Sequence, residues 1–201
     1  MNAAAHRLAE LLGPPTHHPA PVPWELAPEA HPDLRFPSDY RRLIDTYGSI
    51  RIREDLGIHG PSRKNFYGEG FAAVIAATAD VGDQVEYVHE QPKFRKRTSP
   101  TPPYPMFPAP GGLLSWGGDT FGNYFFWLTE DQDPDNWPVV VWFQEIEVWD
   151  VFDGGLAAFL VSLLTGEYHM ADEILMDRGR LWHFTGDWNG DAPRSPDSRE
   201  P

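Results

Sequence analysis

The sequence predicts an α+β fold in which a single antiparallel, mostly meandering β-sheet of about four to six strands is flanked by helices. Three observations predict it. Short apolar and aromatic runs recur between residues 113 and 152, turn-forming Gly, Pro, Asn and Asp separate them, and apolar residues keep helical spacing before and after this region. A chain of 201 residues is also long enough to bury one substantial core.

The central part of the predicted sheet contains five of the eight Trp residues of the chain. Its four predicted strands are Leu113–Trp116, Tyr124–Leu128, Val139–Phe143 and Ile146–Phe152. A Gly117-Gly118-Asp119 turn is expected after the first strand, and a tight turn or bulge at Gln144-Glu145 before the last. Aromatic side chains pack well on a half-buried pleated surface, so we expect most of these Trp residues to lie in the core.

Helical periodicity predicts the elements before the sheet. The apolar residues of segment 40–47 recur at i, i+3, i+4 and i+7, which predicts a helix capped by Ser38 or Asp39 and ended by Gly48. The other elements expected here are a helix at Ala3–Leu12, a helical turn within Trp24–Leu34, a strand at Ile50–Ile52, a loop at Gly57–Arg63 and a helix around Glu69–Asp80.

The elements expected after the sheet are a helix from Leu156 to Gly166, a second helix over Glu167–Met176, and a strand or docked segment at Leu181–Phe184. The resulting organisation has three parts. Residues 1–23 are a helix followed by a proline-rich arm, residues 24–185 are the α+β domain with an inserted loop at 91–111, and residues 186–201 are a disordered tail.

Negative charge is concentrated on the predicted sheet and the helix that follows it. The formal charge of −14 divides into −1 for residues 1–97, −13 for 98–177 and 0 for 178–201, because no Lys or Arg lies between Arg97 and Arg178. An acidic chain is repelled by nucleic acid and by anionic lipid. We therefore expect neither nucleic acid nor a membrane as a partner, and a basic protein instead. The basic segment Lys93–Arg97 is expected to be a solvated loop.

Several classes of function lack their signature. The chain has no Cys, no run of ~20 apolar residues and no secretory h-region, which favours a cytoplasmic location. Phosphate-loop, dinucleotide and hydrolase motifs are absent, and no cofactor is expected. Asp119 is expected to bond turn amides rather than to catalyse. His169, Asp172 and Glu173 have helical spacing that could bind a metal, but a solvated polar face is favoured, so we expect neither a metal site nor an enzyme.

Three segments of the chain carry a family resemblance. They are the helix that opens with Phe36-Pro37-Ser38-Asp39-Tyr40 and closes on Tyr47-Gly48, the strands around Trp116-Gly117-Gly118-Asp119, and the apolar helix after the sheet. Their order and spacing over residues 24–175 resemble the SUKH superfamily, which comprises fungal cell-wall-assembly regulators and bacterial immunity domains. The leading arm, the middle insertion and the tail depart from that pattern.

The residues favour a binding protein whose acidic, aromatic-rich surface captures a basic partner. The resemblance implies more, namely an immunity protein that neutralises a toxin domain, often a nuclease. A regulatory or scaffold protein of the same family is the alternative, and a carboxylate- or metal-dependent hydrolase is a lesser one; the oligomeric state stays open. The predicted partner-binding residues are Asp119, Glu130, Asp131, Asp133, Asp135, Trp137, Glu145, Glu147, Trp149, Asp150 and Asp153.

Overall fold

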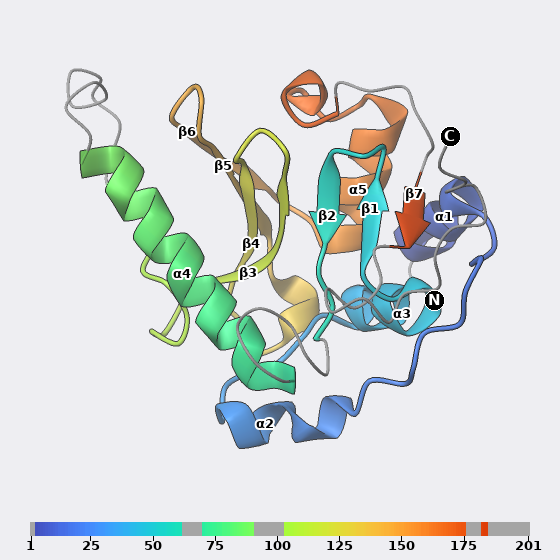
Figure 1. Ribbon diagram of the computed structural model, residues 1–201, viewed down its shortest axis with the longest axis horizontal. Coiled ribbons are helices and arrows are strands. Elements are labelled where there is room, and N and C mark those ends of the chain that lie inside the picture. The colour runs from blue at the N-terminus through green and yellow to red at the C-terminus, as the bar shows by residue number, and fades with distance from the viewer. Residues whose placement is uncertain (1–2, 62–69, 91–102, 176–181, 185–201) are drawn as a thin grey trace, which may run out of the picture.

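The computed structural model describes residues 3–61, 70–90, 103–175 and 182–184 (Figure 1). The α-helices are α1 (Ala3–Leu12), α2 (Ala27–Ala30), α3 (Ser38–Tyr47), α4 (Gly70–Glu90) and α5 (Leu156–Thr165), and the 3-10 turns are η1 (Trp24–Leu26), η2 (Pro134–Asn136) and η3 (Ala171–Glu173). The strands are β1 (Ile50–Ile52), β2 (Leu56–Ile58), β3 (Leu113–Asp119), β4 (Tyr124–Leu128), β5 (Val139–Phe143), β6 (Val148–Phe152) and β7 (Trp182–Phe184). Segment Lys93–Arg97 and the tail 186–201 lie outside the described residues.

All the strands join one antiparallel sheet in the order β6-β5-β4-β3-β2-β1-β7. The first six strands are in chain order from β1 to β6, which makes them a meander, and β7 is added beside β1. This confirms the predicted fold class, with seven strands in the described residues. Among the described strands, the two edges of the sheet are therefore β6 and β7.

The larger core lies between one face of the sheet and the helices α1, α3 and α5. Tyr40 of α3 is buried against Trp127 of β4, with ring centroids 4.8 Å apart, and Phe159 of α5 packs on Trp116 at 6.1 Å. Leu8 and Leu12 bury the apolar side of α1 in the same cluster. Buried aromatic side chains each remove ~150–250 Å² from water, so this layer supplies most of the hydrophobic stabilisation.

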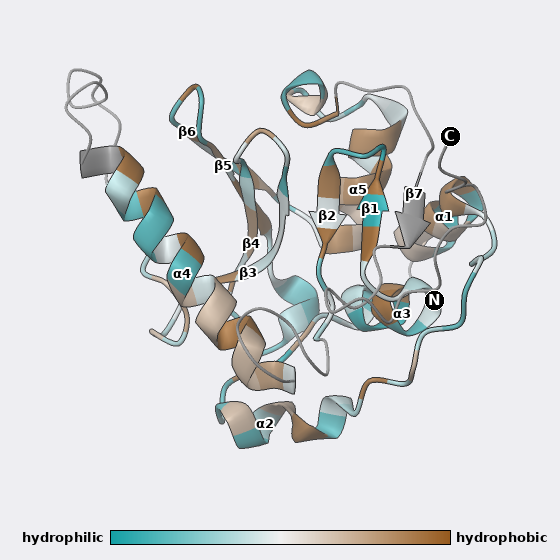
Figure 2. Ribbon diagram, viewed as in Figure 1, coloured by the Kyte–Doolittle hydropathy of each residue, from teal (hydrophilic) through white to brown (hydrophobic). Residues whose placement is uncertain are grey.

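Helix α4 covers the opposite face of the sheet. Its second half buries Val81 and Val85 in a smaller cluster with Phe126, Val140 and Trp142. Figure 2 shows the half of α4 nearer α2 as more hydrophobic than the other half, in keeping with a first segment rich in Ala, Val and Ile. The sequence predicted a helix around Glu69–Asp80, and the structure extends it to Glu90; Gly82 lies within the helix, where it packs closely on Met106.

The predicted helix over 38–47 is confirmed, but its N-terminus is stabilised from a distance. Pro37 occupies the N-cap position and makes no side-chain bond; instead the Ser38 amide donates to Asp135 Oδ1 at 2.5 Å. Asp39 Oδ2 accepts from the Ala157 amide at 2.8 Å and so caps α5, although burial raises the pKa of this carboxyl. Each of these carboxylates therefore satisfies a free N–H at the start of a helix that it does not belong to.

Three other predictions differ from the structure. Gly117 and Gly118 lie inside β3 rather than in a turn, and a Cβ at Gly117 would approach Gly57 O to 2.4 Å, so the neighbouring strand requires glycine there. The segment predicted as a loop after residue 57 begins inside β2. The second helix over Glu167–Met176 is reduced to the 3-10 turn η3, because Gly166 adopts φ 75° and redirects the chain.

Candidate functional site

The structure divides the predicted partner-binding residues between the two ends of the sheet. In an antiparallel meander, alternate connections lie at opposite ends. The turns β3–β4 and β5–β6 share one end, here called the turn end, which carries Asp119, Glu145 and Glu147. The β4–β5 connection forms the other end, called the loop end, which carries segment 130–135 and Asp153. Strand β6, with Trp149 and Asp150, runs between them.

At the loop end, the four acids of segment 130–135 are exposed but their backbone is tightly held. Asp131 Oδ1 accepts from the Asp133 amide at 2.8 Å, and Asp133 Oδ1 accepts from the Asp135 amide at 3.1 Å. Arg35 donates to Gln132 O at 2.9 Å. Carboxylates that bond amides two residues on are typical of Asx turns, so these side chains are part of the loop's own construction.

Two of the predicted partner-binding residues at this end also bond other segments of the chain. Trp137 is only 3% exposed, and its indole N–H donates to Asp131 O at 2.7 Å. Its ring is therefore buried beneath segment 130–135 and offers little surface to a partner. Asp135 holds the first free amide of α3, as described above. All four acids, Glu130, Asp131, Asp133 and Asp135, remain exposed around this framework.

At the turn end, Asn123 joins three segments. Its side chain is 3% exposed; Nδ2 donates to Asp119 Oδ2 at 2.7 Å and to Glu173 O at 3.0 Å, while Oδ1 accepts from the Gln144 amide at 3.1 Å. Asp119 Oδ1 also accepts from the amides of Phe121 and Asn123. Asp119 thus bonds amides of the β3–β4 turn, as the sequence analysis expected. Burial raises the pKa of this carboxyl to about 6 in spite of these hydrogen bonds.

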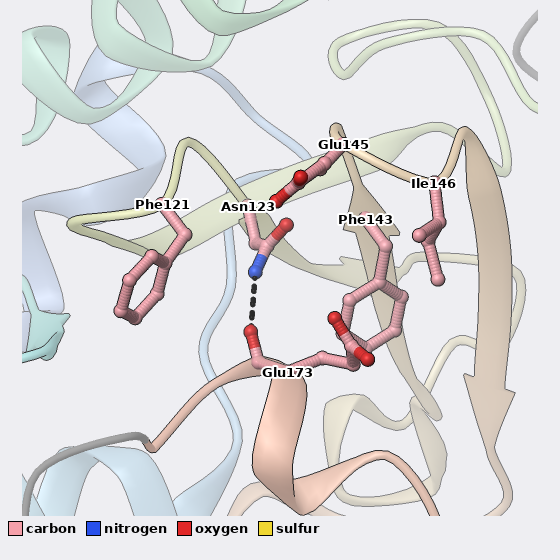
Figure 3. Close-up of a pocket in the computed structure, with 6 residues that line it drawn as sticks. All are labelled: Phe121, Asn123, Phe143, Glu145, Ile146 and Glu173. Atoms are coloured by element: carbon pink, nitrogen blue, oxygen red, sulfur yellow. Dashed lines mark hydrogen bonds between the residues drawn. The ribbon is translucent and has the colours of Figure 1, made fainter.

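The β5–β6 turn presents one of its two acids to solvent. Glu145 is exposed, whereas Glu147 is 5% exposed and has a left-handed φ of 55°. A small pocket lies between this turn, the β3–β4 turn and η3 (Figure 3). It is lined by Phe121, Asn123, Phe143, Glu145, Ile146 and Glu173. At about 40 Å³ it is far smaller than the ~300–1,000 Å³ of small-molecule sites.

Strand β6 and the turn before it expose apolar side chains that the sequence analysis did not single out. Ile146, Val148 and Val151 are 37%, 39% and 46% exposed, and they are three of the six large hydrophobic side chains found exposed among the described residues. Trp149 is half-buried and packs on Trp142 with ring centroids 4.8 Å apart. The alternation that could have shown this is weak, because five of the seven residues 146–152 are apolar and they lie on both faces of the strand.

Acids interrupt and flank this apolar strand. Asp150 accepts from the Tyr168 hydroxyl at 2.7 Å and lies 3.5 Å from His169 Nε2, and Asp153 is exposed directly after β6. We call the exposed residues Glu145, Ile146, Val148, Val151 and Asp153, with the half-buried Trp149 and Asp150, the acidic edge. It places exposed apolar surface next to carboxylates at one edge of the sheet.

The residues considered for metal or hydrolase chemistry do not form a cluster. His169, Asp172 and Glu173 are exposed and follow no regular helix, since only Ala171–Glu173 forms a 3-10 turn. Over the ranges that the structure covers, no three His, Cys, Asp or Glu side chains gather where a metal ion could bind them. Within the same ranges, no helix combines the length and apolar character needed to cross a membrane.

Comparison with known families places this geometry in context. Residues 28–160 match the model of the SUKH_6 family, described as SMI1-KNR4 cell-wall. The matched segment runs from α2 to α5 and includes the whole of β1 to β6, which means that the acidic edge lies inside it. Comparisons with curated proteins and with solved structures gave no match.

Proposed function

The chain belongs to the SUKH superfamily, and on that premise we propose that it is a non-enzymatic immunity protein that neutralises a basic toxin domain by binding it at the acidic edge. The partner is bound and not turned over. The encounter takes place in the cytoplasm, where a toxin that attacks nucleic acid would have to be intercepted.

One observation carries the proposal: exposed apolar residues and unbalanced carboxylates share one edge of the sheet. Val148 and Val151 supply apolar surface, and covering it with a partner stabilises the complex by ~25 cal/mol per Å². Glu145 and Asp153 supply negative charge at the two ends of the strand. Residues 98–177 contain no Lys or Arg to balance them. Apolar contacts of this kind give affinity, while the charges select the partner and speed association.

The chemistry of the acidic edge favours a positively charged protein. A nuclease must present Lys and Arg to the phosphates of its substrate, and an acidic inhibitor is complementary to that surface. The turn-end pocket fits the same partner, because it combines apolar walls from Phe121, Phe143 and Ile146 with the carboxylates of Glu145 and Glu173. A Lys or Arg side chain has a matching apolar stem and charged tip.

A regulatory role is the second candidate, and the family's description as cell-wall supports it. In that case the same edge binds a cellular protein that need not be basic. The product of the neighbouring reading frame separates the two roles. If it is a toxin domain, co-expression of this chain should restore growth of a host that is otherwise killed, and the purified chain should block the toxin's activity at a one-to-one ratio. Survival that does not depend on this chain contradicts the immunity role.

Association kinetics then test whether the acidic edge is responsible. Reversal of the exposed acids Glu145→Lys and Asp153→Lys together should slow association with the purified toxin domain about 10-fold at low ionic strength and flatten its salt dependence. The matched control is Glu25→Lys with Glu29→Lys, which makes the same charge change on exposed positions of η1 and α2. Equal slowing by both pairs would show that net charge matters and the location of the acids does not.

A further inference from the structure

We propose that the acidic edge binds its partner by sheet extension: a basic, extended segment of the partner adds as a new strand alongside β6. The inference rests on the proposed function, and it specifies how the partner is held. In this arrangement the outward N–H and C=O groups of β6 bond the partner's backbone, and side chains on either side supply specificity.

The first argument is that β6 is an edge without the features that block any added strand; its one charged residue, Asp150, opposes only strands of like charge. The strand ends the sheet, and among the described residues no segment pairs with its outer side. Natural proteins shield edge strands with Lys, Pro, bulges or very short length. Strand β6 has five residues, contains neither Lys nor Pro, and pairs with β5 in continuous register from Val148 to Phe152 without a bulge. Its backbone is therefore a regular template of the length of an ordinary strand.

The second argument is the chemical pattern that a new strand would meet. The register with β5 assigns Trp149 and Val151 to the face of Trp142 and Val140, and Val148 and Asp150 to the face of Phe143 and Val141. A strand added to β6 continues both faces, since successive side chains alternate. Its complement is an apolar side chain beside Trp149 and Val151, and a basic one beside Asp150, with further Lys or Arg toward Glu145 and Asp153.

The third argument decides between that occupant and a second copy of this chain. Two β6 strands paired antiparallel about a two-fold axis through Asp150 would set these carboxylates opposite each other, and like charges directly opposite are destabilising. Each copy also has a formal charge of −14, so the two molecules repel as they approach. The same carboxylates attract a basic strand. The acids thus act against self-pairing and in favour of the proposed partner.

The test uses the full chain, labelled with 15N, and a short blocked peptide of alternating Lys and Val as the probe. We expect its binding to shift amide signals of residues 146–153 together with the Trp149 indole signal. A strand edge uses every second amide, so the peptide is also made with alternate amides N-methylated, in both phases. One phase should lose binding at least 10-fold and the other should retain it. Equal effects in both phases, or shifts spread over all acidic surfaces, overturn sheet extension.

Protein variants supply the second arm. Val151→Lys protects the edge and repels a basic strand, so it should weaken peptide binding at least 10-fold while the urea midpoint stays unchanged. Tyr87→Lys makes a similar change at a 63% exposed position on α4 and should leave binding intact. If Val151→Lys neutralises the toxin as well as the parent chain does, sheet extension is wrong and the immunity role stands. If the parent chain does not neutralise the toxin, the immunity role is wrong, and the peptide experiment alone then tests sheet extension at β6. Dimerisation that Val151→Lys abolishes assigns the edge to self-pairing.

Discussion

Replacement of Asn123 by Ala should destabilise the protein, because this side chain holds three segments of the turn end together. It donates to Asp119 Oδ2 and to Glu173 O, and it accepts from the Gln144 amide. The change removes all three hydrogen bonds while keeping the backbone amide of residue 123 available to Asp119 Oδ1, at 2.8 Å. The β3–β4 turn, the β5–β6 turn and η3 then lose their shared contact.

The magnitude follows from the number of bonds. A buried hydrogen bond contributes ~0.5–1.5 kcal/mol net, so three give a loss of ~2–4 kcal/mol. The lower part of that range is expected, because the adjoining pocket is open and water can reach the groups left behind. Asn123→Asp should behave differently, since it sets a second carboxylate beside Asp119. Its stability should rise as the pH falls and the pair takes up a proton.

Urea unfolding followed by Trp fluorescence measures this loss as a lower midpoint with an unchanged m-value. Hydrogen exchange adds a local measurement, because the Gln144 amide should lose protection in the Asn123→Ala variant. Asn136→Ala, at an exposed position of η2, is the matched control and should change stability by less than ~0.5 kcal/mol. A loss below ~1 kcal/mol with an unchanged Gln144 amide would refute the reasoning.

Two further predictions concern single residues of the two ends. Burial raises the pKa of Asp119 from 3.8 to about 6, so the folded chain retains a proton over a pH range in which the unfolded chain has lost it. The stability of the folded chain must therefore fall as the pH rises from about 4 to about 6, by at most ~2–3 kcal/mol and by less with solvent screening. Urea midpoints measured across this pH range should show the fall, and Asp119→Asn should remove it. Trp137→Phe removes the 2.7 Å bond to Asp131 O and should cost ~1–2 kcal/mol of stability without slowing association with the toxin domain; slower association at unchanged stability would make Trp137 a partner contact.

Local patterns were sufficient for the elements whose signal lies within one segment. The apolar spacing of 40–47 predicted α3, and all four of its apolar residues are buried. The three strands from 124 onward were located to within two residues for the same reason. What the patterns lacked was contact between distant segments. Glycine is typical of turns, yet Gly117 lies in β3, where Gly57 O of the neighbouring strand is too close to admit a Cβ.

The candidate site shows the same limit. Segments 130–135 and 145–147 are close in sequence and both acidic, but the meander sends them to opposite ends of the sheet. Composition also does not show which carboxylates have a role in the fold: Asp135 accepts from the first amide of α3, and Glu147 is buried in the β5–β6 turn. Connectivity could have indicated the edge. In a meander each strand pairs with the strand before it and the strand after it. Strand β6 is joined to β5 by a tight turn and is followed directly by α5, so no next strand covers its outer side in the meander.

The distribution of charge is the last physical reason to look for a partner at this edge. Thirteen acids without one Lys or Arg in residues 98–177 repel each other, and self-repulsion of this kind destabilises a compact state. Several of these carboxylates offset part of that cost by holding the fold, as Asp119 and Asp135 do. Glu145 and Asp153 are exposed on either side of an apolar strand, where acids keep the strand from pairing with its own copies. The same arrangement leaves the edge open to a strand that carries the opposite charge.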